Sequence, residues 1–179
     1  GIGYEWGQRY DMDTGKELCK NRTQADRLFL CITGLMAVSV LCFLFEAVKL
    51  GFIPLFSDKP HAYSYFHISG VHYFTISCIL IPAITVLYQK VSEEAGRKEQ
   101  IVIVLANITA AAIPILCVSR FQLLFAVGFA MVTYIMVYQG VRLRTLAGIA
   151  AALIPLYVIL TVFRHHDIAY LNGIFEMKY

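Results

Sequence analysis

Arg120 is the only charged residue between Glu99 and Arg142. It lies between two apolar runs, 101–118 and 121–141, and each run is long enough to cross a bilayer, for which about 20 residues suffice. A charge near that depth costs roughly 2.5–3.5 kcal/mol on insertion scales. We therefore expect this arginine to have an anionic partner, either a side chain or a ligand.

A second polar group follows the last apolar run, where the chain reads Arg164, His165, His166 and Asp167. Arginine binds phosphate oxygens through forked, charge-assisted hydrogen bonds, and a histidine within reach of a sugar hydroxyl can act as a general base. The two histidines are adjacent and point to different faces of a helix, so we expect at most one to face a site. Together with Arg120, these residues could bind an anionic headgroup and move a proton.

The segment 51–70 contains further candidates. It is rich in Pro, Gly and aromatic residues, and it is too apolar for an ordinary solvated loop. We expect it to lie on the membrane surface or to dip back into the protein, where irregular backbone is tolerated. Tyr65 and His67 within it, and His72 just after it, are candidate substrate-binding residues.

Each of these residues also has a purely structural interpretation. Arg120 could snorkel to lipid headgroups, and Arg164 could anchor the end of a span. Tyr65 and the histidines could be interfacial residues without a ligand. Glu46 and Lys49 are three residues apart, so we expect them to pair along one helix.

The elements that position these residues are predicted to be membrane helices. Hydrophobic residues make up 59% of the 179 residues and charged residues only 15%, whereas soluble domains average about 25% charged residues. This composition predicts an all-α, polytopic membrane helix bundle. Five runs are long enough to span: 28–50, 71–89, 101–118, 121–141 and 145–163.

The basic residues predict which side each connection faces. Nine of those close to the spans lie in one set of connections: Lys16, Lys20, Arg22, Arg27, Lys90, Arg97, Lys98, Arg142 and Arg144. The other set holds Lys59, Arg120, Arg164 and Lys178, with Lys49 near that side. The excess predicts a cytoplasmic segment 1–27, a membrane domain 28–163, and outer-side segments 51–70 and 164–179.

Cysteine and acidic residues indicate no metal site. The five cysteines are scattered without a CxxC spacing, and they are read as small buried hydrophobic residues: Cys19, Cys31, Cys42, Cys78 and Cys117. No acidic cluster has the spacing expected for Mg²⁺ or Mn²⁺. The chain begins at Gly1 in a polar segment and ends soon after its last span, so we expect it to be a piece of a longer protein.

Several short motifs resemble a known family. These are the sequence GFIPLFS (51–57) after the first span, Ser69–Gly70, the pair Ser119–Arg120 at the start of a span, and Arg164 after a later span. From about residue 28 onward, the chain resembles the bacterial oligosaccharide repeat unit polymerases, also called O-antigen or Wzy-type polymerases. Members of that family have roughly twice as many spans.

The resemblance implies an enzyme of the bacterial inner membrane with its site on the outer side. Such an enzyme joins repeat units carried on undecaprenyl pyrophosphate into O-antigen, capsule or exopolysaccharide, without a nucleotide sugar, metal or other cofactor. Arg120 and Arg164 would stabilise the leaving pyrophosphate, and His165 or His166, or else His67 or His72, would accept a proton. The implied partners are lipid-linked oligosaccharides, membrane lipids, a chain-length regulator and a flippase, and no nucleic acid.

Three alternatives remain open. An O-antigen ligase-type transferase would use the same arginines with a different acceptor. A transporter or flippase of lipid-linked glycans should have charged residues facing a pathway at mid-membrane depth, and the spans contain essentially none. A non-catalytic membrane scaffold would tolerate Arg120→Ala and Arg164→Ala.

Overall fold

The computed structural model describes residues 21–57, 61–92, 94–140 and 142–165, with side chains to Val162. Every regular element in these residues is helical, which confirms the all-α prediction. Five segments are long and apolar enough to cross a membrane. They are α2 (Arg22–Leu50), the segment Val71–Val91, α6 (Arg97–Leu116), α7 (Arg120–Tyr138) and α8 (Leu143–His165).

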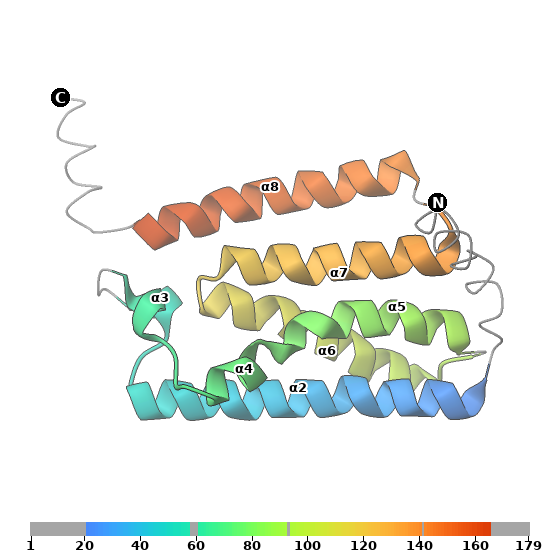
Figure 1. The fold of residues 1–179 in the computed structure, drawn as a ribbon, viewed down its shortest axis with the longest axis horizontal. Coiled ribbons are helices and arrows are strands. Elements are labelled where there is room, and N and C mark those ends of the chain that lie inside the picture. Colours follow the sequence, from blue (N-terminus) through green and yellow to red (C-terminus); the bar gives the residue numbers. More distant parts are fainter. Residues whose placement is uncertain (1–20, 58–60, 93, 141, 166–179) are drawn as a thin grey trace, which may run out of the picture.

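These five segments run alternately in opposite directions, so their connections gather at two ends of the molecule (Figure 1). We call one the 51–70 end; it holds that segment, the turn between α6 and α7, and the last turn of α8. We call the other the 92–96 end; it holds the start of α2, the connection before α6 and the connection after α7. The sets of connections distinguished by their basic residues thus lie at opposite ends.

Helix α2 has a defined cap at each end. The Asn21 side chain accepts a hydrogen bond from the Thr23 backbone N–H at 3.0 Å, so the helix begins ahead of the predicted residue 28. Gly51 ends it with φ 74°, a left-handed conformation that glycine adopts at little cost. The 29-residue helix is therefore bounded by local sequence at both ends.

The second segment is not a uniform α-helix. It comprises α4 (Val71–Ile76), the 3-10 helix η3 (Ser77–Leu80) and α5 (Ile81–Val91). Pro82 lies in the first turn of α5. A proline lacks the backbone N–H that would bond to the preceding turn and clashes with its carbonyl. The helix therefore tightens before Pro82 and changes direction, as Figure 1 shows.

The core lies where α2, α5 and α6 pack together. Ala106 and Ala110 of α6 are buried there, and such small residues allow helices to approach closely. Two side-chain contacts join the helices by hydrogen bonds. Asn107 of α6 donates to the Thr85 hydroxyl of α5 at 2.9 Å, and Ser39 of α2 donates to the Phe74 carbonyl of α4 at 3.1 Å.

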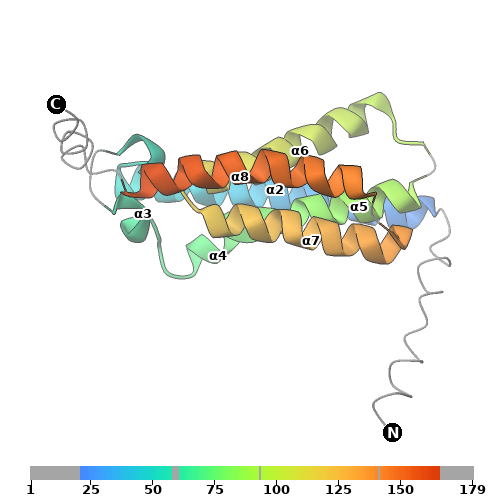
Figure 2. The same ribbon diagram turned by 90° about the horizontal axis from the view of Figure 1, so that it is seen from above.

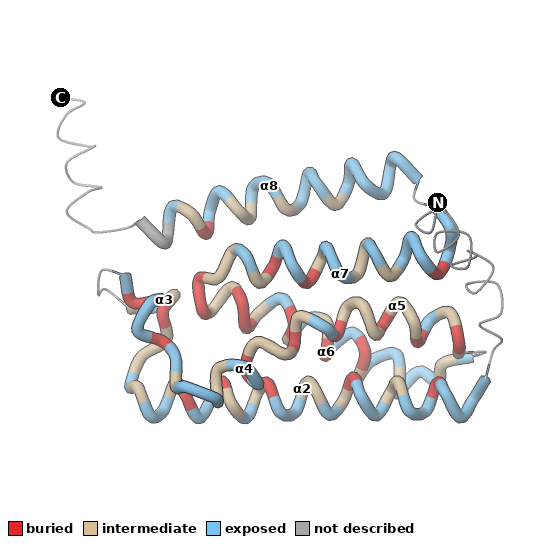
Figure 3. Tube along the Cα trace, viewed as in Figure 1, coloured by how far each residue is buried: buried red, intermediate tan, exposed pale blue. Residues whose placement is uncertain are grey.

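Helix α8 lies along α7 at the periphery of the bundle (Figures 1 and 2). Most of its described residues are exposed, as Figure 3 shows, and Leu160 is the one that is fully buried. Large apolar side chains also face outward elsewhere, among them Leu30 (71% exposed) and Val48 (82% exposed) of α2. An apolar surface of this kind is expected where helices face lipid or further protein.

The described parts of the 51–70 segment pack onto the bundle. It contains the 3-10 helix η2 (Pro54–Phe56) and the short helix α3 (Ala62–Tyr65). Phe66 is only 2% exposed, and its ring lies 5.7 Å from that of Phe43 and 5.8 Å from that of Phe52. This aromatic contact fixes the segment against the end of α2.

Candidate functional site

Arg120 is the first residue of α7, directly after the tight turn from α6. In that turn Val118 has φ 54°, a conformation that is rare for a β-branched residue. The Val118 side chain is nevertheless buried, and it packs with Leu123 and Leu160. This packing compensates for the strained backbone and determines where the arginine emerges.

The Arg120 guanidinium is held by α8. Its Nη1 donates a hydrogen bond to the Thr161 hydroxyl at 2.8 Å, and that hydroxyl donates in turn to the Tyr157 carbonyl at 2.7 Å. The guanidinium carbon also lies 5.1 Å from the centroid of the Tyr157 ring and 5.3 Å from that of Phe121. Cations are attracted to aromatic faces at such distances, so the group is oriented from two sides.

This guanidinium retains unused hydrogen-bonding capacity. Its Nε is buried and has no hydrogen-bond partner among the described residues, and the same holds for Oε1 of Gln122. None of the described carboxylates forms an ion pair with Arg120. The anionic side chain that the sequence led us to consider is therefore not found in the described part of the chain. A buried donor without a partner is costly, which makes this guanidinium an exceptional group among the described residues.

Glu46 forms the second polar cluster at this end. Its carboxylate is fully buried and accepts hydrogen bonds from the Ile68 backbone N–H at 2.9 Å and the Thr75 hydroxyl at 2.7 Å. His72 Nδ1 lies 3.2 Å from the same carboxylate. The expected pairing with Lys49 is wrong, because Lys49 is exposed while Glu46 turns toward α4.

The sequence holds a signal that singles out Glu46. It is the only charged residue between Arg27 and Lys49, just as Arg120 is isolated in its own region. An ionisable residue in an apolar helix usually has a specific partner. Its partners lie 22 to 29 residues further along the chain, so spacing along one helix could not identify them.

Two packed clusters join the surroundings of Glu46 and Arg120. Cys117 belongs to the core cluster that includes Phe43 and Phe66, beside the end of α2. The next residue, Val118, belongs to the cluster formed with α7 and α8, onto which Leu55 and Tyr63 of the 51–70 segment pack. Both polar groups therefore lie at the 51–70 end, on either side of the same turn.

The other predicted site residues are exposed, or their side chains lie outside the described residues. Tyr65 is 69% exposed, and His67 is exposed with its Nδ1 3.2 Å from the Ser64 carbonyl oxygen. Arg164 and His165 belong to the last turn of α8, but their side chains are outside the described residues. His166 and Asp167 also lie outside the described residues.

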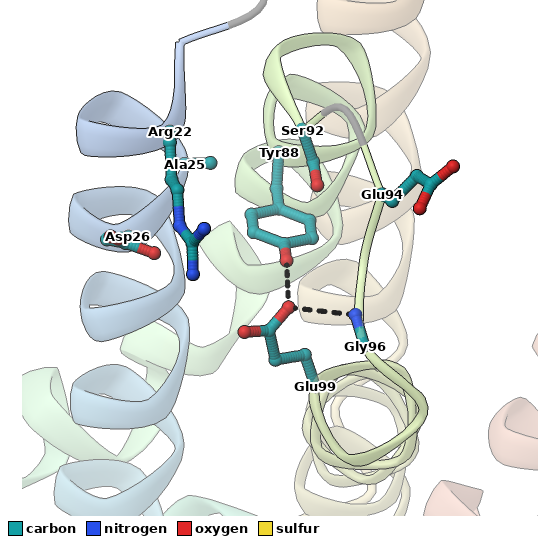
Figure 4. A pocket seen from close by; sticks show the side chains of 8 residues that line it. All are labelled: Arg22, Ala25, Asp26, Tyr88, Ser92, Glu94, Gly96 and Glu99. Atoms are coloured by element: carbon teal, nitrogen blue, oxygen red, sulfur yellow. Dashed lines mark hydrogen bonds between the residues drawn. The ribbon is translucent and has the colours of Figure 1, made fainter.

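A cavity of about 670 Å³ opens at the 92–96 end, far from all of these residues. The Glu99 carboxylate on its wall accepts from the Tyr88 hydroxyl and the Gly96 backbone N–H, each at 3.1 Å. Figure 4 shows Arg22 and Asp26 of α2 facing it from the opposite wall. The sequence did not predict this cavity, because its walls come from three separate parts of the chain.

In the described part of the chain, no three His, Cys, Asp or Glu side chains come together in a way that could hold a metal ion. Comparison with known proteins identifies no relative: no family model, no curated protein and no solved structure matches this chain. The site is therefore interpreted from its own geometry.

Proposed function

We propose that this chain belongs to a membrane glycosyltransferase that polymerises undecaprenyl-pyrophosphate-linked oligosaccharide repeat units into a surface polysaccharide. Its location would be the bacterial inner membrane, with residues 1–27 in the cytoplasm and the site on the outer side. One observation carries the proposal. Arg120 is oriented by Thr161 and two aromatic rings, and one of its buried donors has no partner among the described residues.

The proposed reaction releases negative charge at a defined position. A hydroxyl of one lipid-linked repeat unit attacks the anomeric carbon of the growing chain, and the bond to the lipid pyrophosphate breaks. Arg120 would stabilise the charge that develops on the leaving pyrophosphate. A preorganised donor in such a role contributes about 3–4 kcal/mol to transition-state stabilisation. A polyprenyl-linked substrate requires a membrane location, and five described helices that are long and apolar enough to cross a membrane support this part of the proposal.

The remaining predicted residues are candidates for binding the substrate. Arg164, at the end of α8, would be the second cation for the pyrophosphate, and His165, His166 and Asp167 follow it directly. Tyr65 and His67 are exposed on the 51–70 segment, where they could contact sugar. Tyr65, His67 and the last residues of α8, Arg164 and His165, lie at the same end of the bundle as Arg120. His166 and Asp167 follow directly in the chain. This placement supports the assignment.

The test is the length distribution of surface polysaccharide in a polymerase-deficient host that expresses the complete protein. We expect wild type to restore a ladder of chain lengths on a gel, and Arg120→Ala to collapse it to a single repeat unit. Arg144→Ala is the matched control, because Arg144 is an exposed arginine at the 92–96 end. Membrane levels of all variants are equalised by blotting.

A third variant separates charge from geometry. Arg120→Lys retains the positive charge but not the planar fork, so we expect only partial recovery of the ladder. Full activity of the lysine variant would contradict the clamp role. A wild-type protein that leaves single units would overturn the polymerase proposal and favour a ligase or transporter, while a ladder that survives Arg120→Ala would make Arg120 a membrane anchor.

A further inference from the structure

The buried carboxylate of Glu46 has three polar partners. Its two oxygens meet a backbone N–H, a hydroxyl and an imidazole, all from residues 68–75. The side chain has no exposed surface. A carboxylate buried in this way is stable only when hydrogen-bond donors satisfy it, so each of the three donors contributes to keeping it in place.

The arrangement orients the imidazole of His72. An ionised carboxylate only accepts hydrogen bonds, so in the arrangement on which the inference depends Nδ1 donates to Glu46. The other nitrogen, Nε2, is then the basic one. The His72 side chain is 27% exposed, whereas Glu46 is fully buried. The imidazole is therefore the member of the pair that keeps exposed surface.

We infer that His72 is the general base of the transfer and that Glu46 is its positioning residue; this inference rests on the proposed function. His72 Nε2 takes the proton of the acceptor hydroxyl as the new glycosidic bond forms and the anomeric carbon–pyrophosphate bond breaks. The bonding electrons leave with the pyrophosphate. The positive charge gained by the imidazole is stabilised by the Glu46 carboxylate at Nδ1.

The other described histidines lack this environment. His67 Nδ1 faces a backbone carbonyl and His61 Nδ1 faces the Tyr63 hydroxyl, and both side chains are exposed. Neither partner carries a charge that would stabilise an imidazolium. Among the described residues, Glu46 is the one charged group that contacts a histidine.

The position of His72 also fits the role. It lies in the first turn of α4, directly after the 51–70 segment, at the same end of the bundle as Arg120. A single transfer that uses both residues requires the substrate to extend from Arg120 to His72 across this end of the bundle. Thr75, one turn further along α4, holds the Glu46 oxygen nearest to His72.

The experiment measures initial rates of polymer formation in membranes that contain the complete protein. The probe is the undecaprenyl-pyrophosphate-linked repeat unit extracted from the polymerase-deficient host. We expect His72→Ala to lower the rate by about 10²–10⁴-fold. Added imidazole should restore part of this rate, because the side chain that it replaces is reached from outside. Glu46→Gln should lower the rate by about 10²-fold or more and change the pH profile, because a neutral amide does not stabilise the imidazolium.

Two controls separate catalysis from folding. His61→Asn changes an exposed histidine in the same segment to a residue that tolerates its left-handed backbone, and it should retain the wild-type rate. Thermal unfolding of each purified variant reports whether the fold is intact. Glu46→Asp keeps the charge on a shorter side chain, so it should recover more of the rate than Glu46→Gln.

The outcomes separate the inference from the proposed function. If Arg120→Ala abolishes polymer formation while His72→Ala retains the wild-type rate, the polymerase stands and the inference is wrong. It is also wrong if the losses follow unfolding alone, with an unchanged pH profile and no rescue by imidazole. If the wild-type protein forms no polymer, the proposed function fails and the inference fails with it.

Discussion

Glu46 and Glu99 show how the same chemical group is used differently at the two ends of the molecule. Each carboxylate accepts hydrogen bonds from one backbone N–H and one hydroxyl. Glu46 has no exposed surface and also contacts an imidazole. Glu99 is half-buried beside a cavity and caps the first turn of its own helix.

The difference lies in how far along the chain the partners are. Glu99 bonds to Gly96, three residues away, as the capping of α6 requires, and to Tyr88 eleven residues away. Glu46 is bonded to residues 22 to 29 positions later. The 92–96 end is thus organised mainly by local capping and exposed charge, and the 51–70 end by tertiary contacts that bury charge. Buried charge is the costly arrangement, and it is at that end that we place the chemistry.

The largest expected difference concerns Phe66, whose buried ring holds the 51–70 segment against α2. Phe66→Ala should lower the free energy of unfolding by about 3–5 kcal/mol, because it removes a buried ring from between two others. Its exposed neighbour provides the control, and Tyr65→Ala should change that free energy by less than about 0.5 kcal/mol. Chemical or thermal unfolding in detergent measures both. Equal effects would mean that the segment does not pack as described.

The two carboxylates should differ by a smaller amount. Glu46→Ala leaves three donors without their acceptor and should cost about 3 kcal/mol in the free energy of unfolding. Glu99→Ala removes a helix cap at a half-buried position and should cost about 1 kcal/mol. The two variants are compared by unfolding under identical conditions. A larger cost at Glu99 would reverse the distinction between the two ends.

The contact that orients Arg120 can be tested through the reaction rate. Thr161→Val removes the hydroxyl that accepts from the guanidinium and keeps the branched shape, so we expect the rate of polymer formation to fall about tenfold. Thr133→Val is the control, because that hydroxyl bonds only within its own helix, to the Phe129 carbonyl. Rates are measured at equal membrane levels. An unchanged rate in Thr161→Val would mean that the aromatic rings suffice to position the arginine.

The smallest expected difference concerns the helix caps. Asn21→Ala removes the cap of α2 at the 92–96 end and should cost about 1 kcal/mol in the free energy of unfolding. Ser119 has the corresponding position before α7 at the 51–70 end, but its side chain makes no capping hydrogen bond. Ser119→Ala should therefore cost less than about 0.5 kcal/mol. A cost at Ser119 as large as that at Asn21 would show that local capping matters equally at both ends.

Much of the helical architecture follows directly from the order of the residues. Apolar runs about 20 residues long predict helices because a helix satisfies all of its own backbone hydrogen bonds. Asn21 and Gly51 mark the ends of α2 through local chemistry, and Pro82 marks the change within the second segment. Arg120 could be recognised as exceptional because it is isolated in an apolar region.

The environment of each polar group could not be obtained in the same way. The sequence interpretation paired Glu46 with Lys49, since neighbours on one helix are the only contacts that spacing can predict. In the structure, Glu46 faces α4 and Lys49 is exposed. Thr161, which holds Arg120, lies 41 residues later and has no feature in the sequence that distinguishes it from the other threonines of the helices.

The order of the residues is thus enough to predict a helical protein, five long apolar runs and the isolated charged residues. It is enough because hydrophobicity and helix ends depend on residues within a few turns of one another. The contacts of Glu46 with His72 and of Arg120 with Thr161, and the polar cavity at the opposite end, arise from tertiary packing. Such contacts depend on the rotation and the packing of whole helices, which many distant side chains determine together.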